Sequence, residues 1–298
     1  MPLRSTSSEP KSGKRHRSAQ YHRARIRHFL FTTGPNRLCR GWLVRRHHDD
    51  PVIARELEIT MPQWPAAFDG LRIAHISDLH FGELMPLDRA LGIVELIAAA
   101  QPDMVCNTGD LVDLDCCGVA PLAQAIGRIK APCGNFFVPG NHDELDAPDH
   151  VNRLINESGT TVLEDEICVI RRGEEELRVG GIGWARTPTH CRSRIDRTLG
   201  KNESVDLLLS HNPKAFDHAA ERDVSLVLSG HTHGGQIARR NRPNANLAIA
   251  HRRSAGLYEM GASRLFVTTG AGAWFPIRVN CPAEVAFLTI RRASVHSH

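Results

Sequence analysis

Five short clusters of carboxylate, carboxamide and imidazole residues occur along this chain, each directly after an apolar run. They are Asp-Leu-His (78–80), Gly-Asp-Leu-Val-Asp (109–113), Gly-Asn-His-Asp (140–143), Ser-His (210–211) and Gly-His-Thr-His (230–233). A short apolar run predicts a buried strand, and a cluster after it lies at the sheet edge where open α/β folds bind ligands. Mixed oxygen and imidazole ligands suit Mn, Fe or Zn. The pattern therefore predicts a metal site built from strand ends.

Asp110 is the residue around which we expect this site to form. It follows an apolar run and a glycine turn, and we interpret it as a carboxylate shared by two metal ions. Alternate residues of an extended segment point the same way, so Asp78 is expected beside His80, and His231 beside His233. Two divalent ions roughly 3.5–4 Å apart can clamp the attacking and leaving oxygens of a displacement at phosphorus, with a hydroxide between them as nucleophile.

Each cluster, taken singly, has another explanation. Glycine, asparagine and aspartate favour turns, so residues 140–143 alone could be a turn. His211 alone could lie beside the cap of a helix near Pro213. All five clusters in one chain, each after an expected strand, favour the metal site.

The five clusters in this order resemble the motifs of the calcineurin-like metallophosphoesterase superfamily, over about residues 70–291. The resemblance implies an α/β fold, a four-layer α/β/β/α sandwich of two mixed sheets flanked by helices, with a dinuclear site at the strand ends. It assigns one metal to Asp78, His80, Asp110 and His233, and the other to Asp110, Asn141, His211 and His231. His142 matches the catalytic histidine that protonates the leaving oxygen or stabilises phosphoryl charge, and Asp113 matches the carboxylate that orients it. Support of Asn141 is the alternative role for His142.

Segments 66–82, 230–237 and 270–284 resemble a bacterial branch that includes a membrane-associated UDP-2,3-diacylglucosamine pyrophosphatase and cell-wall-associated phosphoesterases. The implied activity is hydrolysis of a phosphodiester or pyrophosphate bond, with a nucleotide-linked lipid as the suggested substrate and a role in lipid metabolism. This chain departs from the branch at Ala283, where a second proline is usual, and at Trp184, where a more acidic loop is expected.

Two residues of the late loops are candidate substrate contacts. Arg278 could bind phosphate oxygens through its paired N–H groups, and Trp274 could stack on a base or line an acyl pocket. The alternatives are a solvated arginine and a core aromatic.

Other functions use the same ligand set. A nuclease or a phosphomonoesterase needs the same chemistry, and a scaffold could bind metals without catalysis. The presence of both His142 and Asp113 favours an enzyme. Nucleic acid is the less favoured partner, because the basic N-terminal segment has few of the interleaved aromatics of single-strand binders.

Charge divides the 298 residues into two parts. Residues 1–48 hold 12 lysines and arginines and one acid, whereas residues 49–298 hold 25 and 32, respectively. We therefore expect a basic arm, largely disordered or amphipathic, followed by one catalytic domain. Residues 1–20 are expected to be disordered. Within residues 21–46, apolar side chains at helical spacing among arginines suggest contact with an anionic membrane, the alternative being packing on the domain or exposure to solvent. These apolar residues are Ile26, Phe29, Leu30, Leu38, Trp42 and Leu43.

The chain shows no secretory signal pattern and no apolar stretch of the roughly 18–20 residues needed to span a bilayer. Its eight cysteines are scattered without a CxxC pair, which is typical of reduced thiols. The expected location is the cytoplasm, with peripheral attachment to the inner membrane as an extension of that prediction. Periodicity predicts helices over 87–100, 120–130, 149–158 and 213–221, and a hairpin of strands 161–171 and 177–182.

Overall fold

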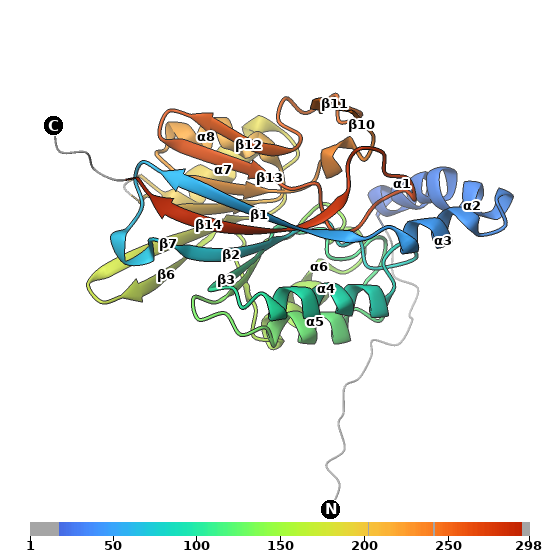
Figure 1. The fold of residues 1–298 in the computed structure, drawn as a ribbon, viewed down its shortest axis with the longest axis horizontal. Coiled ribbons are helices and arrows are strands. Elements are labelled where there is room, and N and C mark those ends of the chain that lie inside the picture. The colour runs from blue at the N-terminus through green and yellow to red at the C-terminus, as the bar shows by residue number, and fades with distance from the viewer. Residues whose placement is uncertain (1–17, 202, 241, 294–298) are drawn as a thin grey trace, which may run out of the picture.

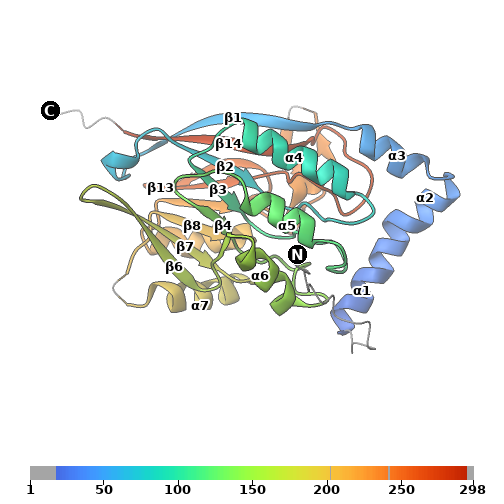
Figure 2. The same ribbon diagram turned by 90° about the horizontal axis from the view of Figure 1, so that it is seen from below.

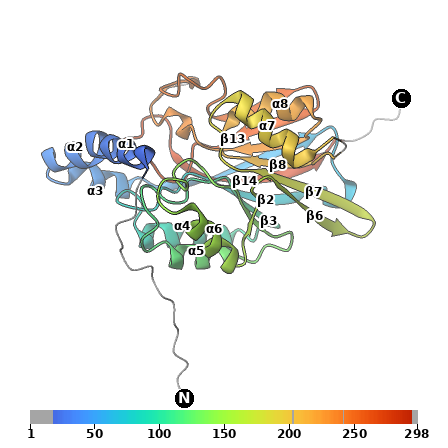
Figure 3. The same ribbon diagram turned by 180° about the vertical axis from the view of Figure 1, so that it is seen from behind.

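The computed structural model describes residues 18–201, 203–240 and 242–293. Two six-stranded mixed sheets pack face to face, and helices cover the outer face of each (Figures 1 and 3). The predicted four-layer α/β/β/α sandwich is therefore confirmed.

The two sheets are built from strands that are far apart in the chain. In spatial order, the first sheet contains β1 (Val52–Met61), β14 (Ala283–Arg292), β2 (Leu71–Ile76), β3 (Met104–Asn107), β4 (Asn135–Phe137) and β5 (Thr161–Val162). The second contains β12 (Gly256–Met260), β13 (Ser263–Val267), β9 (Leu226–Ser229), β8 (Leu207–Ser210), β7 (Glu175–Ile182) and β6 (Glu166–Arg172). The outer helices are α4 (Leu87–Ala99), α5 (Ala120–Gly127) and α6 (Pro148–Glu157) on the first sheet, and α7 (Pro188–Leu199) and α8 (Phe216–Glu221) on the second. Short elements are β10 (Ala238–Arg239), β11 (Arg242–Asn246) and the 3-10 turns Ala66–Phe68, Pro213–Ala215 and His233–Gly235.

Three apolar layers hold this arrangement together, one between the sheets and one under each set of helices. Strand β8 shows why the sequence folds this way. Leu207 and Leu209 face the layer between the sheets, while Leu208 faces α7 and α8. Successive side chains of a strand point to opposite faces, so a continuous apolar run is what a strand buried on both faces requires.

Parallel pairing aligns the strand ends that carry the polar clusters. Strands β2, β3 and β4 are parallel neighbours in the first sheet, and β7, β8 and β9 are parallel neighbours in the second. The carboxyl ends of parallel neighbours meet at one edge, which is where such sheets bind ligands.

One sequence prediction about these elements is wrong. The strand predicted over 161–171 is two strands in different sheets. The amide of Leu163 still bonds to the carbonyl of Phe137 in the first sheet, and Asp165, with φ of 64°, then turns the chain toward β7. The predicted helix over 213–221 is confirmed, with the 3-10 turn Pro213–Ala215 leading into α8. The other predicted helices differ from α4, α5 and α6 only at their ends.

Four short helical segments precede β1 and form an arm at one end of the sandwich (Figure 2). They are α1 (Ala19–His28), a π-helical turn (Phe29–Thr33), α2 (Gly34–Leu38) and α3 (Trp42–Asp49). The disorder predicted for residues 1–20 concerns mainly residues 1–17, which lie outside the described residues, while Ala19 and Gln20 begin α1. Among the residues described, no helix has both the length and the apolar character needed to cross a bilayer.

Contacts at both ends attach the arm to the body. Tyr21 and Ala24 pack against Leu145, which forms a small apolar cluster separate from the main core. At the other end, Arg89 of α4 donates hydrogen bonds to the backbone carbonyls of His47 (3.1 Å) and Asp50 (2.7 Å). The face of α1 that packs is thus not the one that carries Ile26.

Candidate metal centre

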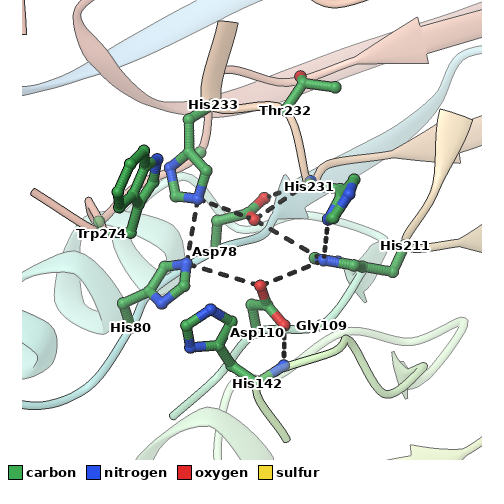
Figure 4. Close-up of polar contacts among 12 residues, drawn as sticks. Asp78, His80, Gly109, Asp110, His142, His211, His231, Thr232, His233 and Trp274 are labelled. Atoms are coloured by element: carbon green, nitrogen blue, oxygen red, sulfur yellow. Dashed lines mark hydrogen bonds and ion pairs between the residues drawn. The ribbon is translucent and has the colours of Figure 1, made fainter. Parts of the chain in front are cut away.

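The five polar clusters meet at the aligned strand ends of the two sheets (Figure 4). Asp78 follows β2, Asp110 follows β3, and His142 follows β4. From the second sheet, His211 follows β8, and the segment containing His233 follows β9. Because the sheets are packed face to face, residues far apart in the chain reach one space.

The backbone at these strand ends is unusual and brings the side chains together. Five of the seven predicted ligands have a positive φ: Asp78, His80, Asp110, His231 and His233. Such a conformation costs on the order of 1–3 kcal/mol for a non-glycine residue, and it clusters at functional sites. Two motif glycines allow close approach, since a Cβ at Gly140 would overlap the Asp110 carboxylate and one at Gly230 would overlap that of Asp78.

One group of ligand atoms comprises Asp78, His80 and His233. The Nε2 atoms of the two imidazoles are 3.0 Å apart, and Nε2 of His233 is 3.2 Å from Oδ1 of Asp78. All three side chains are buried. Together with Asp110, these are the ligands predicted for the first metal.

A second group comprises Asp110, His211 and His231. Nε2 of His211 lies 3.2 Å from Oδ2 of Asp110 and 3.2 Å from Nδ1 of His231. The same Oδ2 of Asp110 is 3.6 Å from Nε2 of His80. One carboxylate oxygen therefore faces imidazoles of both groups, as expected of a shared ligand.

The residues present fit a pair of divalent cations. Oxygen and nitrogen atoms of each group lie within 4.8 Å of one another, and this mixed set suits Mn, Fe or Zn. Asn141, predicted for the second metal, has a buried Oδ1 with no hydrogen-bond partner among the described residues. An unpaired buried acceptor is costly unless something else binds it, and a cation at the second group would do so.

Contacts on the far sides of the rings orient the histidines. Nδ1 of His211 lies 2.6 Å from the carbonyl of Thr108, and Nδ1 of His80 lies 3.3 Å from Oδ1 of Asp113. A ring that donates from Nδ1 has a lone pair at Nε2, where a metal would bind. These outer contacts select the ligand tautomer of both rings.

Burial and charge act in opposite directions on the two carboxylates. Burial raises the pKa of Asp78, against the attraction of His211. Burial also opposes ionisation of Asp110, but the charges of His211 and His142 outweigh it and hold the pKa of Asp110 well below its usual range. The shared carboxylate is therefore the group that stays ionised.

His142 lies beside this shared carboxylate, at the edge of a pocket. Its side chain is 13% exposed, its ring is 4.5 Å from that of His80, and its Nδ1 contacts the carbonyl and the carboxylate of Asp113. Burial opposes protonation of His142, but the charge of Asp110 and the contacts with Asp113 raise its pKa to about 9. With Nδ1 engaged, Nε2 is the nitrogen left to donate a proton to a bound substrate.

The pocket is lined by residues of both sheets and of the arm. They are Ala24, Arg27, His28, His80, Asp110, Asp113, Leu114, Asn141, His142, His231, His233 and Trp274. Asp78 and His211 lie beneath this lining and are fully buried. The structure thus brings all seven predicted ligands and both predicted catalytic residues together, and their roles remain predictions.

Sequence reasoning missed the arm's part in the site. Nδ1 of His28 is 3.0 Å from Oδ2 of Asp113, and its Nε2 is 3.1 Å from Glu83. Thr32 donates a hydrogen bond of 3.1 Å to the carbonyl of Trp274. No motif marks these residues, because their contacts arise only from how the arm packs. The carboxylate that touches His142 is thus held on its other side by the arm.

Asp143 was also missed, although it belongs to the third cluster. Its carboxylate accepts backbone hydrogen bonds from Gly140, Asp110, Leu111 and Val112, at 2.7–3.2 Å. It ties the loop after β4 to the loop after β3. Its position directly after His142 was the sequence signal that could have identified Asp143 as part of the site.

The two predicted substrate residues are placed differently. Trp274 lines the pocket, with its ring 5.5 Å from that of Phe31 in the arm. Arg278 instead donates to the carbonyls of Thr269 (2.9 Å) and Cys281 (3.1 Å) and contacts other carbonyls of the same loop. Substrate binding by Arg278 therefore gains no support from its contacts and stays a prediction, as does that by Trp274.

Trp184, one of the departures in the sequence, lies against the second group. Its ring is 5.5 Å from that of His211 and 4.9 Å from that of His231. The ring of His251 lies 5.1 Å from that of His231. Aromatic walls of this kind restrict the rings and exclude water from that side.

Buried carboxylates and imidazoles thus converge at the strand ends of a two-sheet sandwich and fit a pair of divalent cations. A family model described as calcineurin-like phosphoesterase matches residues 71–235. The chain belongs to this calcineurin-like phosphoesterase family.

Three similar proteins illustrate the match. An uncharacterized metallophosphoesterase of Helicobacter pylori is 33% identical over 233 residues, which cover 74% of this chain and 60% of that protein. The transmembrane protein with metallophosphoesterase domain of Danio rerio is 29% identical, over 80% of this chain and 57% of its own length. Phosphodiesterase YaeI of Escherichia coli is 27% identical, over 74% of this chain and 82% of its own. The chain thus aligns with about 60% of the length of the first two of these relatives.

Proposed function

We propose that this chain hydrolyses a phosphodiester or pyrophosphate bond by in-line attack of water, on a nucleotide-linked lipid such as UDP-diacylglucosamine. The observation that carries the chemistry is the shared carboxylate of Asp110, which lies between two groups of ligands and beside His142. When bound, two divalent cations would supply Lewis-acid activation of the water and neutralise charge on the phosphoryl group.

The chain's own residues would perform the remaining steps. Asp78, His80 and His233 would hold one cation, His211, His231 and Asn141 the other, and Asp110 both. His142 would hold a proton at Nε2 and give it to the leaving oxygen, while Asp113 fixes the ring through Nδ1.

The pocket walls support an amphipathic phosphorylated substrate. Arg27 provides a cation that can bind phosphate oxygens, and Trp274 provides an aromatic face for a base or an acyl chain. The name of the Danio rerio relative places that protein in a membrane, which is consistent with a lipid-linked substrate here.

Hydrolysis of bis-p-nitrophenyl phosphate with added Mn, Fe or Zn tests the chemistry. We expect turnover that depends on the metal and that falls in His142→Ala while both ions are retained. His190→Ala, which changes an exposed histidine of α7, is the matched control. Two bound ions without turnover under any of these metals would favour a metal-binding scaffold and overturn the proposal.

A comparison of substrates tests the finer assignment. UDP-diacylglucosamine should be hydrolysed with a higher kcat/KM than cyclic nucleotides, single-stranded DNA or simple monoesters. Preference for DNA or for monoesters would instead identify a nuclease or a phosphomonoesterase with the same centre.

A further inference from the structure

Large apolar side chains are unusually exposed on the arm. Within the described part of the chain, eight such side chains are more than half exposed, and six of these belong to the arm. They are Ile26, Phe29, Phe31, Leu30, Leu38 and Trp42. An exposed apolar cluster of this kind marks a contact surface.

Helix α1 and the π-helical turn that continues it have two distinct faces. Tyr21 and Ala24 point inward to Leu145, and Arg27 and His28 line the pocket beside them. The opposite face carries Ile26, Phe29 and Leu30, which are 60%, 52% and 57% exposed and line a shallow depression together with Arg25 and His22. We call Ile26, Phe29, Leu30 and Arg25 the outer face.

The arm that carries the outer face is rich in positive charge. Residues 18–50 contain seven arginines and two aspartates. One of the arginines, Arg46, is paired with Asp50 at 3.5 Å, and Arg25 lies over the ring of Tyr21. Apolar side chains among arginines on a helix match the boundary between the acyl chains and the phosphate groups of a lipid bilayer.

We propose that the outer face of the arm docks on an anionic lipid surface. Ile26, Phe29 and Leu30 would enter the acyl boundary, and the arginines would lie at the level of the lipid phosphates. The arm lies at one end of the sandwich and also lines the pocket, so docking would hold the pocket close to the lipid surface (Figures 1 and 2). This surface is independent of the hydrolysis proposed above.

A second copy of this chain is the other candidate occupant. In a two-fold symmetric dimer, the same patch of both copies would meet. Arg25 and the net positive charge of the arm would then meet the same charge on the partner, which is repulsive, whereas an anionic surface attracts them. Charge therefore favours lipid.

Co-sedimentation of the full chain with vesicles is the test. We expect binding to phosphatidylcholine vesicles that contain phosphatidylglycerol, weakening as salt increases, and little binding to phosphatidylcholine alone. The double variant Ile26→Ser, Leu30→Ser should bind at least about tenfold more weakly, because two large apolar side chains no longer enter the bilayer. Val169→Ser, on the β6–β7 hairpin at the opposite end of the molecule, is the matched control.

The double variant should keep its thermal midpoint and its turnover of bis-p-nitrophenyl phosphate, since both side chains lie outside the pocket. Trp42 offers a second measurement in the unmodified arm, because brominated lipids should quench its fluorescence and the quenching should disappear in Trp42→Phe. Equal binding of the double variant would assign the attraction to charge alone and overturn the proposal. The proposal would also be overturned if the chain did not bind vesicles and instead formed a dimer, seen by ultracentrifugation, that the double variant abolishes.

Discussion

The strand-end centre and the arm both line the pocket, but they are held in place differently. The ligands of the centre follow strands that are buried on both faces, and most of them are buried themselves. The arm contacts the body through one small apolar cluster, the rings of Phe31 and Trp274, and a few polar contacts, among them those of His28 and Thr32. Most of its own large apolar side chains face outward.

We therefore expect the centre to determine the chemistry and the arm to determine access to the pocket. Regions with few buried apolar contacts open at lower free energy than the core does, and binding loops and lids are drawn from such regions. The centre therefore belongs to the globally stable part of the fold, whereas the arm can move without loss of the ligands. Changes in the centre should abolish turnover, and changes in the arm should adjust it.

The largest expected effect comes from Asp110→Asn. It removes the carboxylate that both ligand groups share while keeping the shape, and asparagine tolerates the positive φ of 52°. Loss of Lewis-acid assistance worth several kcal/mol predicts a fall in kcat/KM of about a thousandfold or more. Metal analysis should show fewer than two ions per chain.

The control is Asp149→Asn, which changes an exposed carboxylate in the first turn of α6. It should change neither kcat/KM nor the number of bound ions. Two retained ions and undiminished turnover in Asp110→Asn would remove the distinction between centre and arm.

Much of this centre was predictable because its determinants are local. An apolar run such as Leu207–Ser210 identifies a strand, and the imidazole that follows it must lie at the strand's end. Parallel pairing then brings such ends together. His211 and Asp110 were therefore identifiable as neighbours from sequence.

Elements with weaker local signals were missed. Most residues of helix α7 are polar, and its buried residues are Cys191, Ile195 and Leu199. Its apolar periodicity is therefore faint. The cap residue Thr187 was the remaining local signal. In the arm, it is Tyr21 that packs on the body and Ile26 that is exposed, and no sequence signal distinguished the two faces. Which face of a short helix turns inward depends on the partner surface, which the sequence of the helix does not contain.

The next effect in size is that of His142→Ala, which leaves the ligand groups intact. Loss of a general acid costs roughly 100- to 10,000-fold in kcat, with both ions retained. The loss should be smaller for bis-p-nitrophenyl phosphate than for an alkyl diester, because nitrophenolate leaves without a proton. Equal losses for the two substrates would show that His142 acts on the phosphoryl group instead.

His28→Ala tests the contact between arm and centre. The hydrogen bond with Asp113 raises the pKa of His28, against burial. A raised folded-state pKa contributes stability that is complete below the unfolded pKa of about 6.5 and is lost as the pH rises through the folded value. The variant should therefore lower hydrogen-exchange protection of the arm amides about tenfold at pH 6, which corresponds to about 1.4 kcal/mol, and by less at pH 9.

Protection of β3 amides in the same samples should stay unchanged, because that strand lies in the core. A larger loss of arm protection at pH 9 than at pH 6 would contradict the assignment of the contact to a protonated His28.

The smallest effect is expected from Thr32→Val, which keeps the shape of a buried side chain and removes one hydrogen bond, to the carbonyl of Trp274. A bond of this kind contributes about 0.5–1.5 kcal/mol. Arm protection should therefore fall a few-fold to about tenfold, and KM should rise by no more than this. The kcat should be unchanged, since Trp274 lines the pocket but is neither a predicted ligand nor a predicted catalytic residue. Thr33→Val is the matched control, because Thr33 makes only an exposed contact of 3.3 Å with Glu83. If Thr32→Val lowered kcat as His142→Ala does, the arm would belong to the catalytic machinery itself, because a contact that only positions the pocket wall cannot change the rate of the bound complex to that extent.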